Sequence, residues 1–282
     1  MPIGHARALP EKRDRADVMP VLHWPEYLME AALLGCFMLS ACTFASLLNH
    51  PAGPGRRWIS SALGRRALMG GAMGLTAVAL IYSPWGQQSG AHMNPATTLT
   101  FLLRGKVAPL DAAFYTGAQF FGAAAGVALA RLLLRDIVRH QVVNYVVTTP
   151  GARGVTVAWF AELAIAFGMM LMVLVVSNHA IWTPYTGLAA GLLVALYITF
   201  EAPLSGMSLN PARSFGSALV GRQWRSFWVY LTAPVAGMLL ASAVHAALPA
   251  QHVYCAKLAH CNDRPCIFRC EFHALRPAAD GR

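Results

Sequence analysis

Two Asn-Pro-Ala triplets are the residues of this sequence whose types and spacing most clearly suggest chemistry. Proline is favoured in the first turn of a helix, and asparagine is a good N-cap directly before it. Each triplet is therefore predicted to begin a helix. If two such N-termini face each other, their partial positive charges repel cations, while the asparagine amides can donate hydrogen bonds to water. The candidate site residues are Asn94, Pro95, Ala96, Asn210, Pro211 and Ala212.

Arg213 directly follows the second triplet. A charged side chain at the centre of a membrane span costs about 2.5–3.5 kcal/mol, so it is expected to have either a function or a partner. One interpretation is a fixed donor at the narrowest part of a pore. The other is a side chain that reaches back to the lipid headgroups. The neighbours Ser214 and Gly216 offer no apolar span along which to reach, which favours the pore.

Glu30 and Glu162 are isolated acidic residues within long apolar runs. Each is expected to accept backbone N–H groups and so brace the loop before one triplet. Metal binding is the alternative, although two isolated carboxylates are weak evidence for it.

The composition favours a protein that lies mostly in lipid. The chain has 282 residues, of which 56% are hydrophobic and 12% charged, and its mean hydropathy is +0.48. Soluble domains carry about 25% charged residues. The net charge of +10 does not indicate nucleic acid, because the basic residues lie between apolar runs and at the chain ends, as in proteins anchored at headgroups. No nucleotide-binding loop and no Ser/His/Asp set is visible, so we expect no enzyme.

Hydropathy predicts an all-α integral membrane protein. A spanning helix needs about 20 mostly apolar residues, and each short piece at a triplet is too short to cross a bilayer alone. We therefore expect six transmembrane helices and two re-entrant half-helices. The predicted spans are 25–48, 67–85, 108–133, 156–178, 185–203 and 226–248, and the half-helices are 94–103 and 210–220.

The two triplets lie in matching halves, about 25–134 and 155–248. Each triplet follows a Ser-Gly pair, and each half has an early glutamate and a pair of glycines four residues apart. Three spans per half place the second half in the opposite orientation, which predicts an inverted repeat with its site at the midplane. A lone triplet would also fit an ordinary proline turn, but two in matching positions would not.

The segments SGAHMNPATTLT and SGMSLNPARSFGSALV resemble the major intrinsic protein family of aquaporins and glycerol facilitators. The resemblance covers residues 26–248. It implies an aquaporin-like bundle, a homotetramer with one pore per subunit, and cytoplasmic termini in the plasma (cell inner) membrane. Lys and Arg are equally numerous on the two sides, so the orientation depends on the resemblance alone.

Residues that differ between the branches of the family favour the water channels. Glycerol facilitators have Asp after the triplet and its arginine, where this chain has Ser214. They have a basic residue where this chain has Ala218, and Pro with an aliphatic residue in the last span where it has Phe227-Trp228.

The expected selectivity filter gives a different indication. Water-specific members have Phe, His, a small residue and Arg at the constriction. The matching positions here are Met73 (or Gly74), Ile198, Met207 and Arg213. An apolar and wider filter would admit small neutral solutes, whereas flexible methionines could still narrow it.

Two flanking segments complete the expected organisation, namely a cytoplasmic N-terminal segment, 1–24, and a cytoplasmic Cys/His-rich tail, 249–282. The tail contains a weak candidate metal site at Cys255, Cys261, Cys266 and Cys270. Reduced thiols and palmitoylation are the alternatives. No other cofactor is expected.

These features predict a passive channel that conducts water, and small neutral solutes as a further option, while excluding ions and protons. A glycerol facilitator is the alternative within the class. An ion-coupled secondary transporter, which also uses broken helices, is the alternative from another class. Metal or redox control of the pore by the tail is a third option. The expected partners are the lipid bilayer, the solutes and further copies of the chain, with no nucleic acid.

Overall fold

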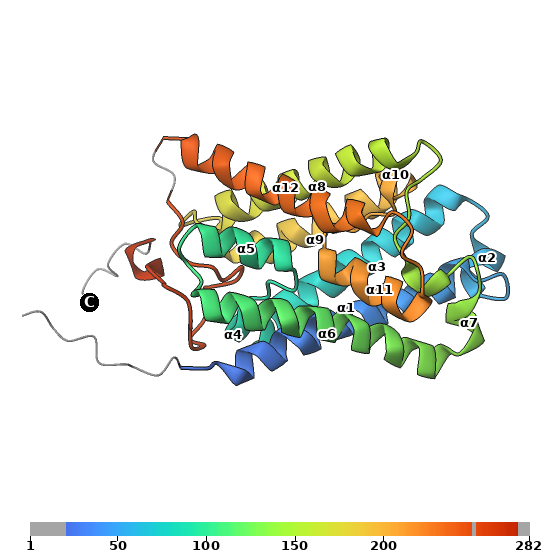
Figure 1. The fold of residues 1–282 in the computed structure, drawn as a ribbon, viewed down its shortest axis with the longest axis horizontal. Coiled ribbons are helices and arrows are strands. Elements are labelled where there is room, and N and C mark those ends of the chain that lie inside the picture. The colour runs from blue at the N-terminus through green and yellow to red at the C-terminus, as the bar shows by residue number, and fades with distance from the viewer. Residues whose placement is uncertain (1–20, 250–251, 276–282) are drawn as a thin grey trace, which may run out of the picture.

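The computed structural model describes residues 21–249 and 252–275, and within them the chain contains helices and irregular segments but no strand. Nearly all of the predicted N-terminal segment 1–24 lies outside the described residues, as do residues 250–251 and 276–282 of the predicted tail. The long helices lie roughly along one axis, and the two short helices α5 and α11 lie among them (Figure 1).

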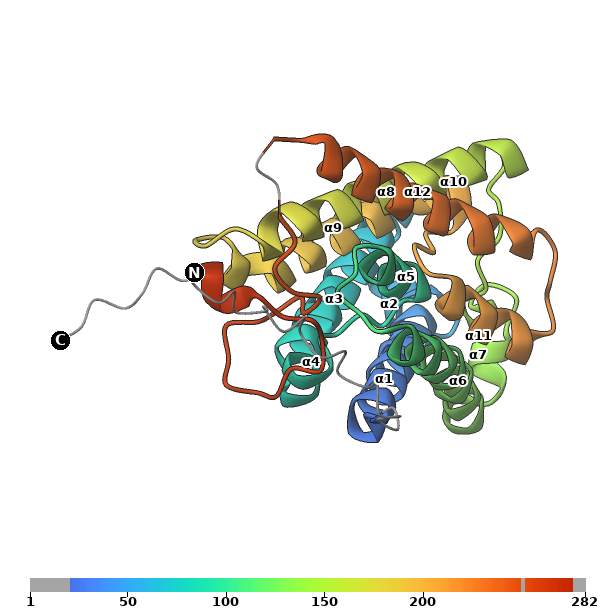
Figure 2. The ribbon, with the colours of Figure 1, turned by 60° about the vertical axis from the view of Figure 1, so that its left-hand side comes forward.

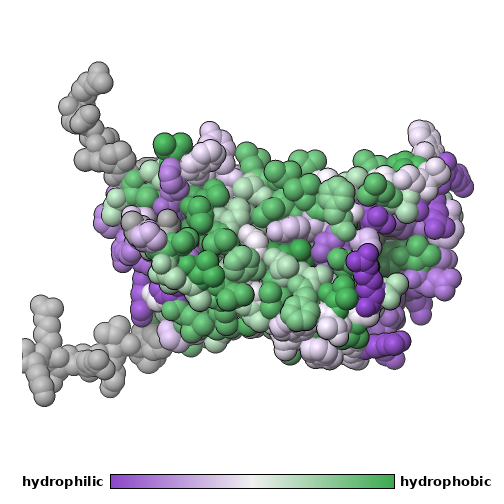
Figure 3. Space-filling view, turned by 90° about the horizontal axis from the view of Figure 1, so that it is seen from above, coloured by the Kyte–Doolittle hydropathy of each residue, from purple (hydrophilic) through white to green (hydrophobic). Residues whose placement is uncertain are grey.

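Six long helices correspond to the six predicted spans. On the face shown in Figure 3, apolar residues predominate in the middle of the bundle and hydrophilic residues gather at both ends. This distribution matches a bilayer, whose apolar core is flanked by headgroups. The helices are α1 (Trp24–Asn49), α3 (Ala62–Tyr82), α6 (Pro109–Leu134), α8 (Val155–Ser177), α9 (Thr186–Phe200) and α12 (Phe227–Ala247).

Among the described residues, five segments are long and apolar enough to cross a membrane. They are Trp24–Trp58, Pro109–Leu134, Val155–Ser177, Thr183–Phe200 and Phe227–Ala247. Helix α3 is not among them, because Arg65 and Arg66 and its glycines lower its hydropathy. It also begins at Ala62, five residues before the predicted span, because the Ser61 side chain caps it by accepting from Gly64 N.

Close helix contacts join the elements within each half and between the halves. Helix α1 packs on α6, α8 packs on α12, and α3 packs on α9 across the two halves. A Cβ added at Gly126 would collide with Gly35 O, and one added at Gly74 would collide with Gly191 O. Small residues at such contacts let helix backbones approach closely in lipid.

Each half-helix follows a short helix and a sharp turn. Helix α4 (Pro84–Ser89) precedes α5 (Pro95–Leu103), and α10 (Ala202–Ser205) precedes α11 (Pro211–Gly221). The turns depend on Gly90 and Gly206, whose φ angles of 92° and 85° are in the left-handed region that glycine adopts without strain. Glycine in each Ser-Gly pair thus ends one helix and redirects the chain toward the triplet. The remaining short helices are α2 (Pro54–Trp58), α7 (Asp136–Arg139), η1 (Asn144–Val146), η2 (Thr183–Tyr185) and η3 (Phe272–Leu275).

Candidate functional site

A cavity of about 440 Å³ lies between the two halves and is lined by residues of both triplet loops and of the long helices. Most of the lining side chains are apolar. Among the described residues that line it, none is acidic, and the charged ones are Arg66 and Arg213. Methionine is frequent in the lining, at Met69, Met73, Met93, Met169, Met170, Met207 and Met238.

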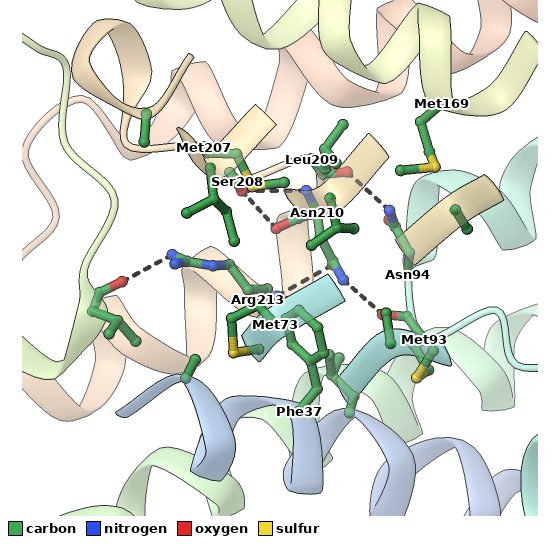
Figure 4. A pocket seen from close by; sticks show the side chains of 18 of the residues that line it. Phe37, Met73, Met93, Asn94, Met169, Met207, Ser208, Leu209, Asn210 and Arg213 are labelled. Atoms are coloured by element: carbon green, nitrogen blue, oxygen red, sulfur yellow. Dashed lines mark hydrogen bonds between the residues drawn. The ribbon is translucent and has the colours of Figure 1, made fainter. Parts of the chain in front are cut away.

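The two triplet asparagines lie side by side in this cavity, and each caps its own half-helix (Figure 4). Asn94 Oδ1 accepts from Ala96 N at 2.9 Å, which caps α5. Asn210 Oδ1 accepts from Ala212 N at 3.0 Å and from Arg213 N at 3.2 Å, which caps α11. The N-termini of the two half-helices therefore meet at the centre of the cavity, where their dipoles place partial positive charge.

Each triplet loop is held by one buried glutamate. Glu30 accepts from Ser89 Oγ, from the backbone N–H groups of His92 and Met93, and from Gln119 Nε2, at 2.6–3.0 Å. Both loops depart from regular backbone, because Ala91 and Met93 in the first loop and Met207 and Leu209 in the second have positive φ angles. These loops cannot bond internally as a helix does, so an external acceptor satisfies their N–H groups.

Glu162 has the corresponding role in the second half. It accepts from Ser205 Oγ at 2.6 Å and from the backbone N–H groups of Ser208 at 2.6 Å and Leu209 at 2.8 Å. A tyrosine hydroxyl supports each loop as well: Tyr115 donates to Ser89 O at 2.7 Å, and Tyr230 donates to Ser205 O at 2.6 Å. The two glutamates therefore use their oxygens on protein donors rather than presenting them to the cavity.

Arg213 extends into the cavity from the first turn of α11. Its Nη1 donates to Val146 O at 2.9 Å (Figure 4). Asn144, Tyr145 and Val146 all have positive φ angles, an unfavourable backbone conformation that persists only where the surroundings enforce it. This segment thus holds the guanidinium in place and leaves its other donors available to the cavity.

All four residues of the predicted filter line the cavity: Met73, Ile198, Met207 and Arg213. Met73 is the member contributed by α3, since Gly74 faces Gly191 of α9 instead. Figure 4 shows Met73 and Met207 on either side of Arg213. The four predicted residues therefore belong to the lining of one cavity.

Phe37 of α1 and Met169 of α8 are among the lining residues that the sequence analysis did not identify. Each lies seven residues, or about two helical turns, after the glutamate of its half. Both therefore face the cavity on the same side of the helix as the loop-bracing carboxylate, and they project from opposite walls (Figure 4). Helical spacing from Glu30 and Glu162 was the signal that could have identified them.

Three of the four cysteines of the predicted metal site lie together with a histidine. Cys255, Cys266, Cys270 and His260 have their ligand atoms within 4.8 Å of one another, whereas Cys261 is exposed and lies outside the group. His260 is therefore the fourth member of the group, in place of the predicted Cys261. The hydrogen bond with Cys255 lowers the pKa of the Cys266 thiol to about 4 and raises that of Cys255.

Comparisons with known proteins find a matching family model and similar chains. The family model described as "Major intrinsic protein" matches residues 29–245. Aquaporin NIP1-1 of Oryza sativa subsp. japonica is 36% identical over 166 residues, 58% of this chain and 56% of its own length. Aquaporin NIP3-1 of Arabidopsis thaliana is 34% identical over 170 residues, 59% of this chain and 52% of its own length. The chain therefore matches a little over half the length of these relatives.

Among solved structures, an aquaglyceroporin from Plasmodium falciparum superimposes with a TM-score of 0.66 and 21% sequence identity. The match covers 80% of this chain and 97% of that one. At this identity the likeness concerns the fold.

Proposed function

The chain belongs to the major intrinsic protein family, and from that premise we propose that it is a passive channel for water and small neutral solutes that excludes ions and protons. It is a multi-pass membrane protein with apolar helices long enough to span a bilayer. The observation that carries the proposal is the meeting of two capped half-helices, at Asn94 and Asn210, inside one cavity.

The exclusion of cations follows from charge. Two helix N-termini and the Arg213 guanidinium contribute positive potential to the cavity, and its described lining contains no carboxylate to offset it. Aquaporin-type pores are known to exclude ions by such means. A neutral solute is not repelled and can accept hydrogen bonds from the asparagine amides and Arg213.

A glycerol facilitator is the second candidate, and the filter residues favour it. Met73, Ile198 and Met207 are apolar, and the two methionines are also flexible. According to the resemblance, a water-specific filter has an aromatic ring in place of Met73 and an imidazole in place of Ile198. An apolar wall beside a single arginine can contact the carbons of a polyol while Arg213 donates to its hydroxyls. The two candidates share one pore and differ in the solutes it passes.

An ion-coupled transporter is less well supported. Coupling needs titratable or ion-binding groups that face the transport path, and the two buried glutamates instead accept hydrogen bonds from their loops. We further propose that the chain assembles as a homotetramer with cytoplasmic termini in the plasma membrane, as the family resemblance implies.

Stopped-flow light scattering on proteoliposomes tests the proposal. Fast shrinkage under an impermeant osmolyte establishes a water pore, and fast reswelling under glycerol establishes the facilitator. Water permeability equal to that of protein-free vesicles would rule out the channel. Solute flux that follows an imposed proton or sodium gradient would favour the transporter.

A further inference from the structure

Residues 252–275 pack on the end of the bundle at which α5 ends (Figure 2). They bond to both halves of the protein. Leu258 N donates to Gly90 O at 3.1 Å, and Ala256 O lies 2.9 Å from His92 Nε2. Tyr254 N donates to Asn178 Oδ1 at 2.6 Å, at the end of α8. The segment is therefore attached directly to the loop that carries the first triplet.

Aromatic contacts strengthen this attachment. Phe268 stacks on the His92 ring, with 5.3 Å between ring centroids and 8° between planes, and His92 also stacks on Phe101 of α5. A Cβ at Gly90 would lie 2.8 Å from the Phe268 ring, so glycine is needed there for the ring to approach. The segment thus covers the triplet loop closely rather than passing over it.

Three thiol sulfurs and one imidazole nitrogen gather inside this segment. Cys255 Sγ and Cys266 Sγ are 3.6 Å apart, Cys270 Sγ and His260 Nε2 are 3.0 Å apart, and all four atoms lie within 4.8 Å of one another. Zn–S bonds of about 2.3 Å and Zn–N bonds of about 2.0–2.1 Å place tetrahedral ligand atoms about 3.6–3.8 Å apart. The group therefore has the size of a tetrahedral zinc site, and its residues follow the spacing Cys-x4-His-x5-Cys-x3-Cys.

The charge around the cluster suits zinc as well. Three thiolates and a neutral imidazole around Zn²⁺ leave one net negative charge. Lys257 lies among these ligands and is 1% exposed, and its Nζ donates to Arg264 O at 3.2 Å and Pro265 O at 2.6 Å. A zinc–thiolate centre would place opposite charge beside this buried side chain.

Leu258 connects the cluster to the cavity. It lies between the ligands Cys255 and His260 in the chain, and it is the residue of the described segment 252–275 that lines the cavity. Fixing Cys255 and His260 on one metal ion therefore also fixes Leu258 in the cavity wall.

We propose that Cys255, His260, Cys266 and Cys270 bind a structural zinc ion, and that this zinc holds residues 252–275 as a cap on the pore mouth with Leu258 in its wall. The zinc site is independent of the proposed channel function, whereas the effect of the cap on permeability rests on it.

Zinc binding is tested on the full chain purified in detergent, loaded with ZnCl₂ and dialysed. Mass spectrometry of the metal content should give one zinc per chain, and Co²⁺ in its place should give the absorption of a tetrahedral thiolate site. Cys266→Ser should weaken zinc binding by at least about 100-fold. Cys261→Ser, the matched control outside the cluster, should retain full occupancy.

His260→Cys keeps four ligands and should also retain zinc. Size-exclusion profiles show whether each variant is folded, so zinc loss caused by a missing ligand can be told apart from zinc loss caused by misfolding. Absence of zinc from the wild type, or equal loss in Cys261→Ser and Cys266→Ser, overturns the site. A Cys255–Cys266 disulfide in the purified protein, found by non-reducing peptide mapping, overturns it also.

The cap is tested by water permeability in proteoliposomes. Removing zinc with a chelator should raise the permeability of the wild type by at least about twofold, because a released segment no longer holds Leu258 in the wall. Zinc should have no effect on Cys266→Ser, and Leu258→Ala should raise permeability even with zinc bound. Equal permeability with and without bound zinc overturns the cap. Absence of water flux in every sample instead contradicts the channel function and leaves the zinc measurement standing.

Discussion

Asn94 and Asn210 each donate one amide N–H to the backbone carbonyl that directly precedes the other. Asn94 Nδ2 donates to Leu209 O at 2.8 Å, and Asn210 Nδ2 donates to Met93 O at 2.6 Å. Because each Oδ1 also caps its own half-helix, neither amide can rotate. A primary amide carries two N–H groups, so one from each asparagine remains for a solute in the cavity. The donors that meet a passing molecule are therefore fixed in direction by the opposite half.

Replacing the asparagines should have unequal effects on stability. Asn210→Ala removes the acceptor for two N–H groups of α11, whereas Asn94→Ala removes the acceptor for one N–H group of α5. Loss of an N-cap costs about 0.5–2 kcal/mol, and one further buried N–H adds about 1 kcal/mol. Thermal unfolding in detergent should therefore show a lower midpoint for Asn210→Ala. Equal midpoints, or the reverse order, would contradict this account of the caps.

Removing the arginine of the cavity should widen the solute range. Arg213→Val deletes the guanidinium that Val146 O holds in the lining. We expect glycerol permeability to rise on the order of tenfold, equivalent to a barrier lower by about 1.4 kcal/mol, because the gain from a wider passage exceeds the loss of the hydrogen bonds that the guanidinium donates to the polyol. Arg225→Gln changes an exposed arginine and serves as the control. Reswelling rates under a glycerol gradient measure the effect, and unchanged rates would exclude Arg213 from the constriction.

Restoring the side chains of a water-specific filter should have the opposite effect. Met73→Phe with Ile198→His replaces two apolar cavity residues with larger or polar rings. Glycerol flux should fall while water flux is largely retained, because water is the smaller solute. Leu75→Phe adds a ring to α3 at a position that is 71% exposed and should alter neither flux. Glycerol flux that survives the double change would place the narrowest point elsewhere.

Changing a loop-bracing glutamate should destabilise the protein. In Glu162→Gln one oxygen becomes a donor, so at least one buried N–H of the second triplet loop, at Ser208 or Leu209, loses its acceptor. We expect a loss of about 1–3 kcal/mol in the free energy of unfolding. Asp136→Asn, at a 94% exposed side chain, is the matched control and should stay near the wild type. Denaturant titration of both variants in detergent gives the comparison, and similar values would show that the brace contributes little.

Packing of α6 on α1 offers a comparison within a single helix. A Cβ at Gly126 meets backbone atoms of Gly35, whereas one at Gly117 meets nothing within 4 Å. Gly126→Ala should therefore cost about 2 kcal/mol or more by forcing the helices apart. Gly117→Ala should be neutral or stabilising, by up to about 1 kcal/mol, because alanine favours helix. Thermal unfolding of the two variants in detergent measures this difference in stability. Equal midpoints would contradict close packing at Gly126.

The spans and half-helices were predictable because lipid imposes simple rules. A helix in a bilayer must be apolar over a length set by the membrane, so hydropathy located all six long helices to within a few residues. The predicted start of α3 was five residues too late, because Arg65 and Arg66 in its first turns lower the local hydropathy. The triplets and glutamates repeat between the halves, and this repetition indicated the centre of the site.

The packing of the C-terminal segment was not predictable in the same way. His92 and Ala256 are 164 residues apart, and no periodicity relates them. Likewise, sequence spacing alone could not show that His260 joins the cysteine cluster and that the neighbouring Cys261 does not. Such contacts depend on how an irregular segment folds on a surface, and neither hydropathy nor helical spacing describes that.

The seam between α3 and α9 has a mechanical consequence. At Gly74 and Gly191 the two backbones are in direct contact, with no side chain between them. Two halves joined in this way resist the rocking by which alternating-access carriers expose a site to each side in turn. Changes in the width of the pore would therefore come from the groups that line it, such as the methionines and Leu258 of the segment 252–275. A pore built in this way has no alternating-access step that could limit its solute flux.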